Sequence, residues 1–69
     1  MDTEEKIEQI LEWANKSAVA AKVKFNTSVV VGIRDWDGEY GFTSAQEEAI
    51  DNIYNRFNVG KWFARQWSS

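Results

Sequence analysis

The sequence predicts a small all-α protein, and three observations lead to this prediction. Apolar residues recur at helical spacing in two long segments. Each of these segments follows a residue that is suited to cap a helix. The first segment is also rich in alanine, which has the highest helix propensity. Because the chain has 69 residues, we expect a single domain over residues 1–69. We expect this domain to be a three-helix bundle with a short C-terminal helix or turn.

The first helix is expected over residues 3–21, with fraying after Lys16 as the alternative. Asp2 or Thr3 opens it, and Asp2 with Glu5 has the spacing of a capping box. Trp13 lies to one side of the apolar stripe, which recurs at helical spacing along this segment. The stripe consists of Ile7, Ile10, Leu11, Ala14, Ala18 and Ala21.

The stretch 22–34 supports two interpretations. One is a strand or hairpin, which would give an α+β fold, because β-branched residues alternate in it. These residues are Val29, Val31 and Ile33. The other is a helix over 27–37, capped by Asn26 or Thr27, whose stripe is longer than the alternating pattern. That stripe consists of Phe25, Val29, Ile33, Trp36 and Tyr40. We expect the helix, with the α+β fold as the alternative.

The clearest helix prediction covers residues 44–57. Thr43 and Gln46 have the spacing of a capping box, in which each side chain bonds the backbone N–H of the other. An apolar stripe follows, formed by Ala49, Ile50, Ile53, Tyr54 and Phe57. Asn58 and Gly60 then offer a stop, and residues 61–67 are expected to add one or two turns.

A pattern within residues 25–57 resembles a known kind of protein. Phe25 and Ser28 precede an apolar helical run, and a Gly-Phe-Thr sequence then leads into the amphipathic helix. The matching residues are Phe25, Ser28, Ile33, Gly41, Phe42, Thr43, Gln46, Ala49, Ile50, Ile53 and Phe57. This segment, about half of the chain, resembles small phage-encoded accessory proteins of uncharacterised function. The resemblance implies a helical hairpin across 27–57 and carries no catalytic residue. The run Val29–Val31 departs from the pattern.

The composition argues against a metal or cofactor. The chain has no cysteine and no histidine, so disulfides are excluded and the usual ligands of zinc, copper and iron are missing. The acidic stretch 35–39 has some features of a calcium loop, but Ile33 and Ser44 stand where that loop needs its first and last carboxylates. We expect no metal and no cofactor.

Catalysis is not expected either. Acid–base catalysis by paired carboxylates needs a shifted pKa, and therefore burial. The acidic residues in question lie in a turn or on a face expected to be solvated. They are Asp35, Asp37, Glu39, Glu47, Glu48 and Asp51. We therefore predict a protein that is not an enzyme.

Charge bears on location and on partners. Eight basic and eleven acidic residues give a net charge of −3, which does not favour nucleic-acid binding. Basic and acidic residues alternate in blocks that are able to pair once the chain folds. No apolar run is long enough for a membrane span, and the acidic N-terminus is unlike a secretory signal. We expect a cytoplasmic location.

Aromatic residues are the main indication of function. Four tryptophans, four phenylalanines and two tyrosines are more than three short helices are able to bury. Exposed aromatic patches tend to mark interaction sites. We therefore expect a binding protein that docks onto another protein, with self-association as a variant. The expected contacts are Trp13, Trp36, Tyr40, Trp62 and Trp67.

The alternative function is nucleic-acid binding. Lys61, Trp62, Arg65 and Trp67 interleave bases and rings, a pattern that suits single-stranded nucleic acid, and Lys22 and Lys24 would assist. The competing structural interpretation is that Trp62 and Phe63 close the core while the cations face water.

Overall fold

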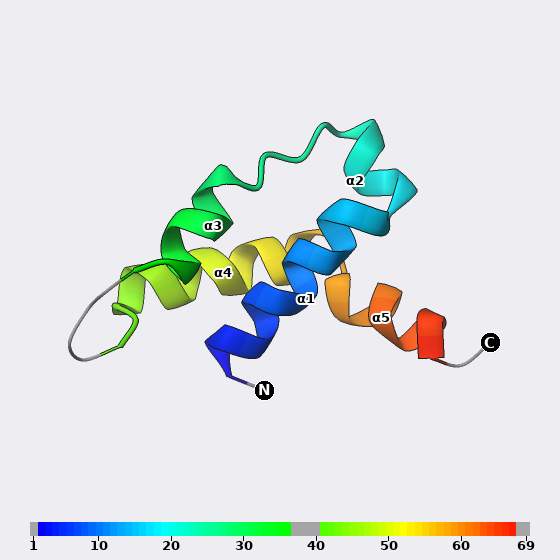
Figure 1. Cartoon of the computed structure of the whole chain (residues 1–69). Coiled ribbons are helices and arrows are strands. Elements are labelled where there is room, and N and C mark those ends of the chain that lie inside the picture. The colour runs from blue at the N-terminus through cyan, green and yellow to red at the C-terminus, as the bar shows by residue number, and fades with distance from the viewer. Residues whose placement is uncertain (1, 37–40, 68–69) are drawn as a thin grey trace.

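The computed structural model describes residues 2–36 and 41–67, which form five α-helices and no strand (Figure 1). The helices are α1 Thr3–Lys16, α2 Ala18–Lys22, α3 Ser28–Arg34, α4 Ser44–Arg56 and α5 Val59–Trp67. The all-α prediction is confirmed. The strand interpretation of 22–34 is wrong, because this stretch contains the end of α2, a short linker and α3.

The first helix begins as expected and ends early. The Asp2 carboxylate accepts a hydrogen bond from the backbone N–H of Glu5 at 2.8 Å and caps α1. The helix expected over 3–21 is interrupted at Ser17, whose backbone is extended. Its hydroxyl accepts from the N–H of Val19 at 3.1 Å and so caps α2. The direction change brings Ala20 into the core. The two later alanines of the expected stripe are exposed: Ala18 and Ala21.

The third helix is shorter than the range 27–37 predicted for it. It ends at Arg34, followed by a turn at Asp35, and position 37 lies outside the described residues. Thr27 makes no side-chain capping bond, whereas the Asn26 side chain accepts from the N–H of Ser28 at 2.9 Å. The core contact of this helix is Val30, which is completely buried.

The predicted capping box opens α4. The Thr43 hydroxyl accepts from the N–H of Gln46 at 3.1 Å, and the Gln46 side chain accepts from the N–H of Thr43 at 2.9 Å. The helix ends within one residue of the predicted boundary. The expected break at 58–60 is confined to Asn58, which has φ 51°, because α5 already begins at Val59. Val59 is fully buried, so this residue anchors the new helix to the core.

The core lies around α1, which contacts each of the other four helices. Figure 1 shows α1 crossing α4, with α3 to one side of the crossing and α5 to the other. The fully enclosed apolar residues come from all five helices: Ile7, Ile10, Trp13, Ala20, Val30, Ile50 and Val59. Two polar contacts also join α1 to α4. Lys6 pairs with Asp51, and the Tyr54 hydroxyl donates to the Gln9 side-chain oxygen at 2.8 Å.

Candidate functional site

Trp13 belongs to the core. Its side chain is 1% exposed, and its ring lies 5.1 Å from that of Phe25 and 5.0 Å from that of Phe57, centroid to centroid. The Phe25 and Phe57 rings meet each other edge to face at 5.5 Å. Trp13, which the sequence indicated as a partner contact, is therefore enclosed in the core and not exposed on the surface of the chain.

The other expected contacts lie at different places. Trp36 is 49% exposed beyond the end of α3, and its indole N–H donates to the Gly41 carbonyl oxygen at 3.1 Å. Tyr40 lies outside the described residues. Trp67 is the last residue of α5, and its side chain lies outside the described part of the chain. Trp62 lies in one hollow with two other predicted site residues, Lys61 and Arg65, and the buried Trp13 lies beneath them.

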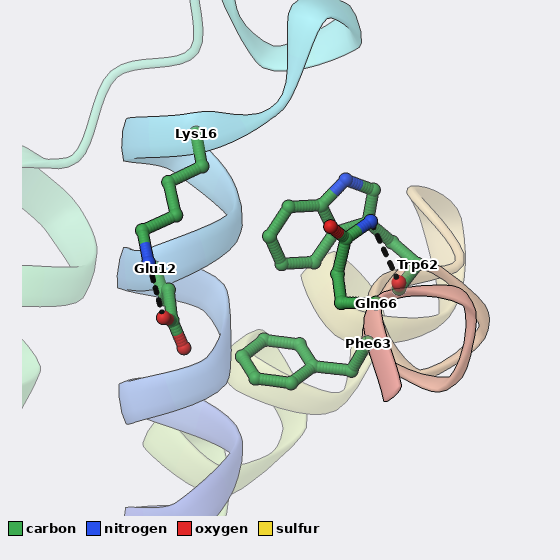
Figure 2. A pocket seen from close by; sticks show the side chains of 5 residues that line it. All are labelled: Glu12, Lys16, Trp62, Phe63 and Gln66. Atoms are coloured by element: carbon green, nitrogen blue, oxygen red, sulfur yellow. Dashed lines mark hydrogen bonds and ion pairs between the residues drawn. The ribbon is translucent and has the colours of Figure 1, made fainter. Parts of the chain in front are cut away.

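Trp62 and Phe63 project from α5 toward α1. Figure 2 shows both rings directed to the side of α1 that carries Glu12 and Lys16. The rings meet edge to face with centroids 5.1 Å apart, and both side chains are half-buried. They line a cleft of about 200 Å³ together with Gln66 and the Glu12–Lys16 ion pair, whose atoms are 2.8 Å apart. This cleft carries no net charge from its lining.

A larger hollow lies between the start of α2, the end of α4 and α5. Its volume is about 400 Å³, and the buried Trp13 and Ser17 are at its floor. Its lining also includes Phe57 and Asn58. The five other lining residues are called the basic groove below: Val19, Arg56, Lys61, Trp62 and Arg65. Trp62 lines both this groove and the cleft against α1.

The basic groove has an unbalanced charge. Among the residues that the structure describes, no acidic one lines it, and its three cationic side chains are all exposed. Within the described residues, the ion pairs are Lys6–Asp51, Lys16–Glu12 and Arg34–Asp35, so none involves a groove cation. Arg56 lies over the Phe57 ring at 5.6 Å from its centroid, a contact that leaves the guanidinium edge available.

Part of the predicted nucleic-acid set is assembled here. Lys61, Trp62 and Arg65 share the groove, whereas Lys22 and Lys24 are exposed and do not line it. Sequence reasoning missed two groove residues that come from other helices, Arg56 and Val19. The position of Arg56 in the last turn of α4, shortly before α5, was the available signal.

In the part of the chain that the structure describes, no group of three acidic residues is placed to hold a metal ion. A hollow between the N-terminal ends of α1 and α4 is acidic, with Asp2, Glu4 and Glu47 in its lining. None of the described helices combines the length and apolar character needed to cross a membrane.

Comparison with known proteins adds no further constraint. The chain matches no protein-family model, no curated protein and no solved structure. The resemblance of residues 25–57 to phage accessory proteins therefore stays a prediction, and the surface is interpreted from its own chemistry.

Proposed function

We propose that this chain is a small, non-enzymatic protein that docks onto another protein through α5 and the groove beside it. The observation that carries the proposal is Trp62, a half-buried indole shared by two adjacent hollows and flanked by cations that form no ion pair with another described residue. Tryptophan and arginine are the residues most enriched at the energetic centres of protein interfaces. A ring that is already held by its neighbours also loses little freedom on binding.

The proposed partner is a protein of the host. The phage-like pattern in residues 25–57 favours an accessory protein that acts on a host protein in the cytoplasm. A large interface is not required for this role, because weak and transient complexes bury less than about 1,200 Å² of accessible surface in total.

The test is an affinity capture from host lysate with the tagged chain, with and without nuclease. We expect a retained protein in both conditions and its loss with Trp62→Ala. The matched control is Trp36→Ala, which removes an exposed indole at the end of α3, remote from both hollows. Far-UV circular dichroism verifies that both variants remain folded. Retention that is unaffected by Trp62→Ala contradicts the proposed surface, and loss with Trp36→Ala places the contact at α3.

A second candidate is nucleic-acid binding, which is favoured by three cations that lie beside Trp62 and form no ion pair within the described part of the chain. It predicts an affinity for single-stranded oligonucleotides that falls steeply as salt rises, because bound cations release counterions from phosphates. Recovery that disappears with nuclease in the capture experiment would favour this function. No mobility shift at low salt would end it.

A further inference from the structure

We propose that the basic groove binds an acidic polypeptide segment that carries an apolar side chain. This inference rests on the protein-docking function proposed above. The occupant is thus a stretch of a partner protein with aspartate or glutamate beside an apolar residue. Three features of the groove support this chemistry: its charge, its apolar wall and its size.

The charge of the groove is the first feature. Lys61 and Arg65 are four residues apart on α5, so their side chains lie on the same helical face, where like charges destabilise each other. Arg56 adds a third positive charge from the end of α4. The chain as a whole has a net charge of −3, so this cluster opposes the overall charge. An anionic partner relieves the repulsion, and arginine pairs with carboxylates through two parallel hydrogen bonds.

The wall of the groove is the second feature. Val19 is 54% exposed at the start of α2, and the half-buried Trp62 lines the same hollow from α5. Removing such apolar surfaces from water is favourable. A ligand that is only anionic leaves this wall uncovered. In a segment with an apolar side chain between its carboxylates, the apolar side chain covers this wall while the carboxylates pair with the cations.

The size and surroundings of the groove favour a peptide over a nucleic acid. The volume of about 400 Å³ is near the lower end of the usual range for ligand sites, about 300–1,000 Å³. Single-stranded nucleic acids are bound by several rings on which successive bases stack. Of the two half-buried rings in this hollow's described lining, Phe57 already packs against Trp13 and lies under Arg56, which leaves Trp62 for stacking. A long polyanion would also approach an acidic protein, with an acidic hollow at the N-terminal ends of α1 and α4.

The test begins with selection of short random peptides on the wild-type protein. Selected peptides are then titrated against two double variants of equal charge change. The groove variant is Lys61→Glu with Arg65→Glu, and the control is Lys22→Glu with Lys24→Glu, two exposed lysines that do not line the groove. A titration with single-stranded oligothymidylate and a sedimentation run accompany each protein.

The proposal predicts peptides enriched in aspartate or glutamate next to leucine, phenylalanine or tryptophan. Their affinity should fall at least about tenfold in the groove variant and stay within about twofold in the control. It should also weaken between about 0.1 M and about 1 M salt, where the Debye length falls from about 10 Å to about 3 Å. Circular dichroism of both variants confirms that the comparison is between folded proteins.

Other outcomes overturn the proposal and separate it from the docking function. Selected peptides that are not acidic, or that bind both variants equally, leave protein docking intact but place it elsewhere. Oligothymidylate binding that is lost only in the groove variant, with no peptide selected, rejects both proposals. Self-association of the wild type that only the groove variant abolishes, again without a selected peptide, identifies a second copy as the occupant.

Discussion

Trp13 is the largest fully enclosed side chain among the residues that the structure describes. It extends from α1 to meet Phe25 in the linker after α2 and Phe57 at the end of α4. One side chain therefore joins three parts of the chain that are far apart in sequence. In a chain of 69 residues, which buries a modest fraction of its surface, such a residue carries a large share of the stability.

We predict that Trp13→Ala destabilises the protein by about 3–5 kcal/mol, because it removes a buried indole and leaves a cavity. Stability of about 0.05–0.15 kcal/mol per residue is typical, so this loss is of the same order as the total. The milder variant Trp13→Phe should keep the fold with reduced stability. Urea denaturation followed by circular dichroism measures both. A cost for Trp13→Ala below about 1 kcal/mol would mean that the indole is not enclosed.

Asn58 occupies the left-handed backbone region between α4 and α5, with φ 51°. Apart from glycine, asparagine tolerates this conformation better than most other residues do. We predict that Asn58→Ala lowers the free energy of unfolding by about 1 kcal/mol, whereas Asn58→Gly changes it by only a few tenths of 1 kcal/mol. Thermal denaturation of the two variants checks the difference. Equal stability of both would show that the turn does not need the left-handed conformation.

Gly60 controls how closely α5 approaches α4. A Cβ atom added at Gly60 would lie 2.8 Å from the hydroxyl oxygen of Tyr54 and 3.3 Å from two ring carbons. The same hydroxyl donates to Gln9 on α1 at 2.8 Å, so the ring is not free to retreat without losing that hydrogen bond. The placement of α5, and with it the basic groove, depends on this contact.

We predict that Gly60→Ala destabilises the protein by about 1–2 kcal/mol, because overpacking outweighs the gain in helix propensity. The cost should be smaller in a Tyr54→Phe background, where the closest oxygen is absent. Denaturant titrations of the four proteins in this double-mutant cycle give the coupling.

The control for this prediction is Gly32→Ala in α3. A Cβ at Gly32 meets no atom within 4 Å, so this variant should be stabilised by up to about 1 kcal/mol. Additive costs in the cycle, or destabilisation by Gly32→Ala of the same size, would contradict the role given to the Tyr54 contact.

Local signals determined those helix ends that the sequence predicted well. The reciprocal bonds of Thr43 and Gln46 open α4, and Asp2 opens α1 as expected. The break at Ser17 was not predictable from propensity, because the alanines around it favour a continuous helix. The break instead allows Phe25 to return to Trp13, a tertiary contact that outweighs the local preference. The burial of Trp13 was missed for the same reason.

The candidate site was predictable in part. Lys61, Trp62 and Arg65 lie within one short segment, so their proximity on α5 follows from helical spacing. Arg56 and Val19 reach the same groove from α4 and α2, and only the packing of those helices around α1 brings them there. The absence of ion pairs around the described groove cations likewise depends on tertiary structure.

Two hollows of opposite charge lie in different parts of the molecule as a whole. The acidic one is at the N-terminal ends of α1 and α4, and the basic groove is at the C-terminal end of α4. With 13 residues, α4 separates its two ends by roughly 20 Å, about two and a half times the Debye length at physiological salt. A ligand in one hollow is therefore largely screened from the other, and we treat the groove as an independent site.

The most direct measurement is photo-crosslinking in host lysate, with a photoreactive phenylalanine analogue placed at one of two valines. Val19 is 54% exposed and lines the basic groove, whereas Val29 is 57% exposed on α3 and lines neither the groove nor the cleft against α1. We predict a nuclease-resistant crosslink to a protein from position 19 and none from position 29. Equal crosslinks from both positions, or a product from position 19 that nuclease removes, would contradict protein docking at the groove.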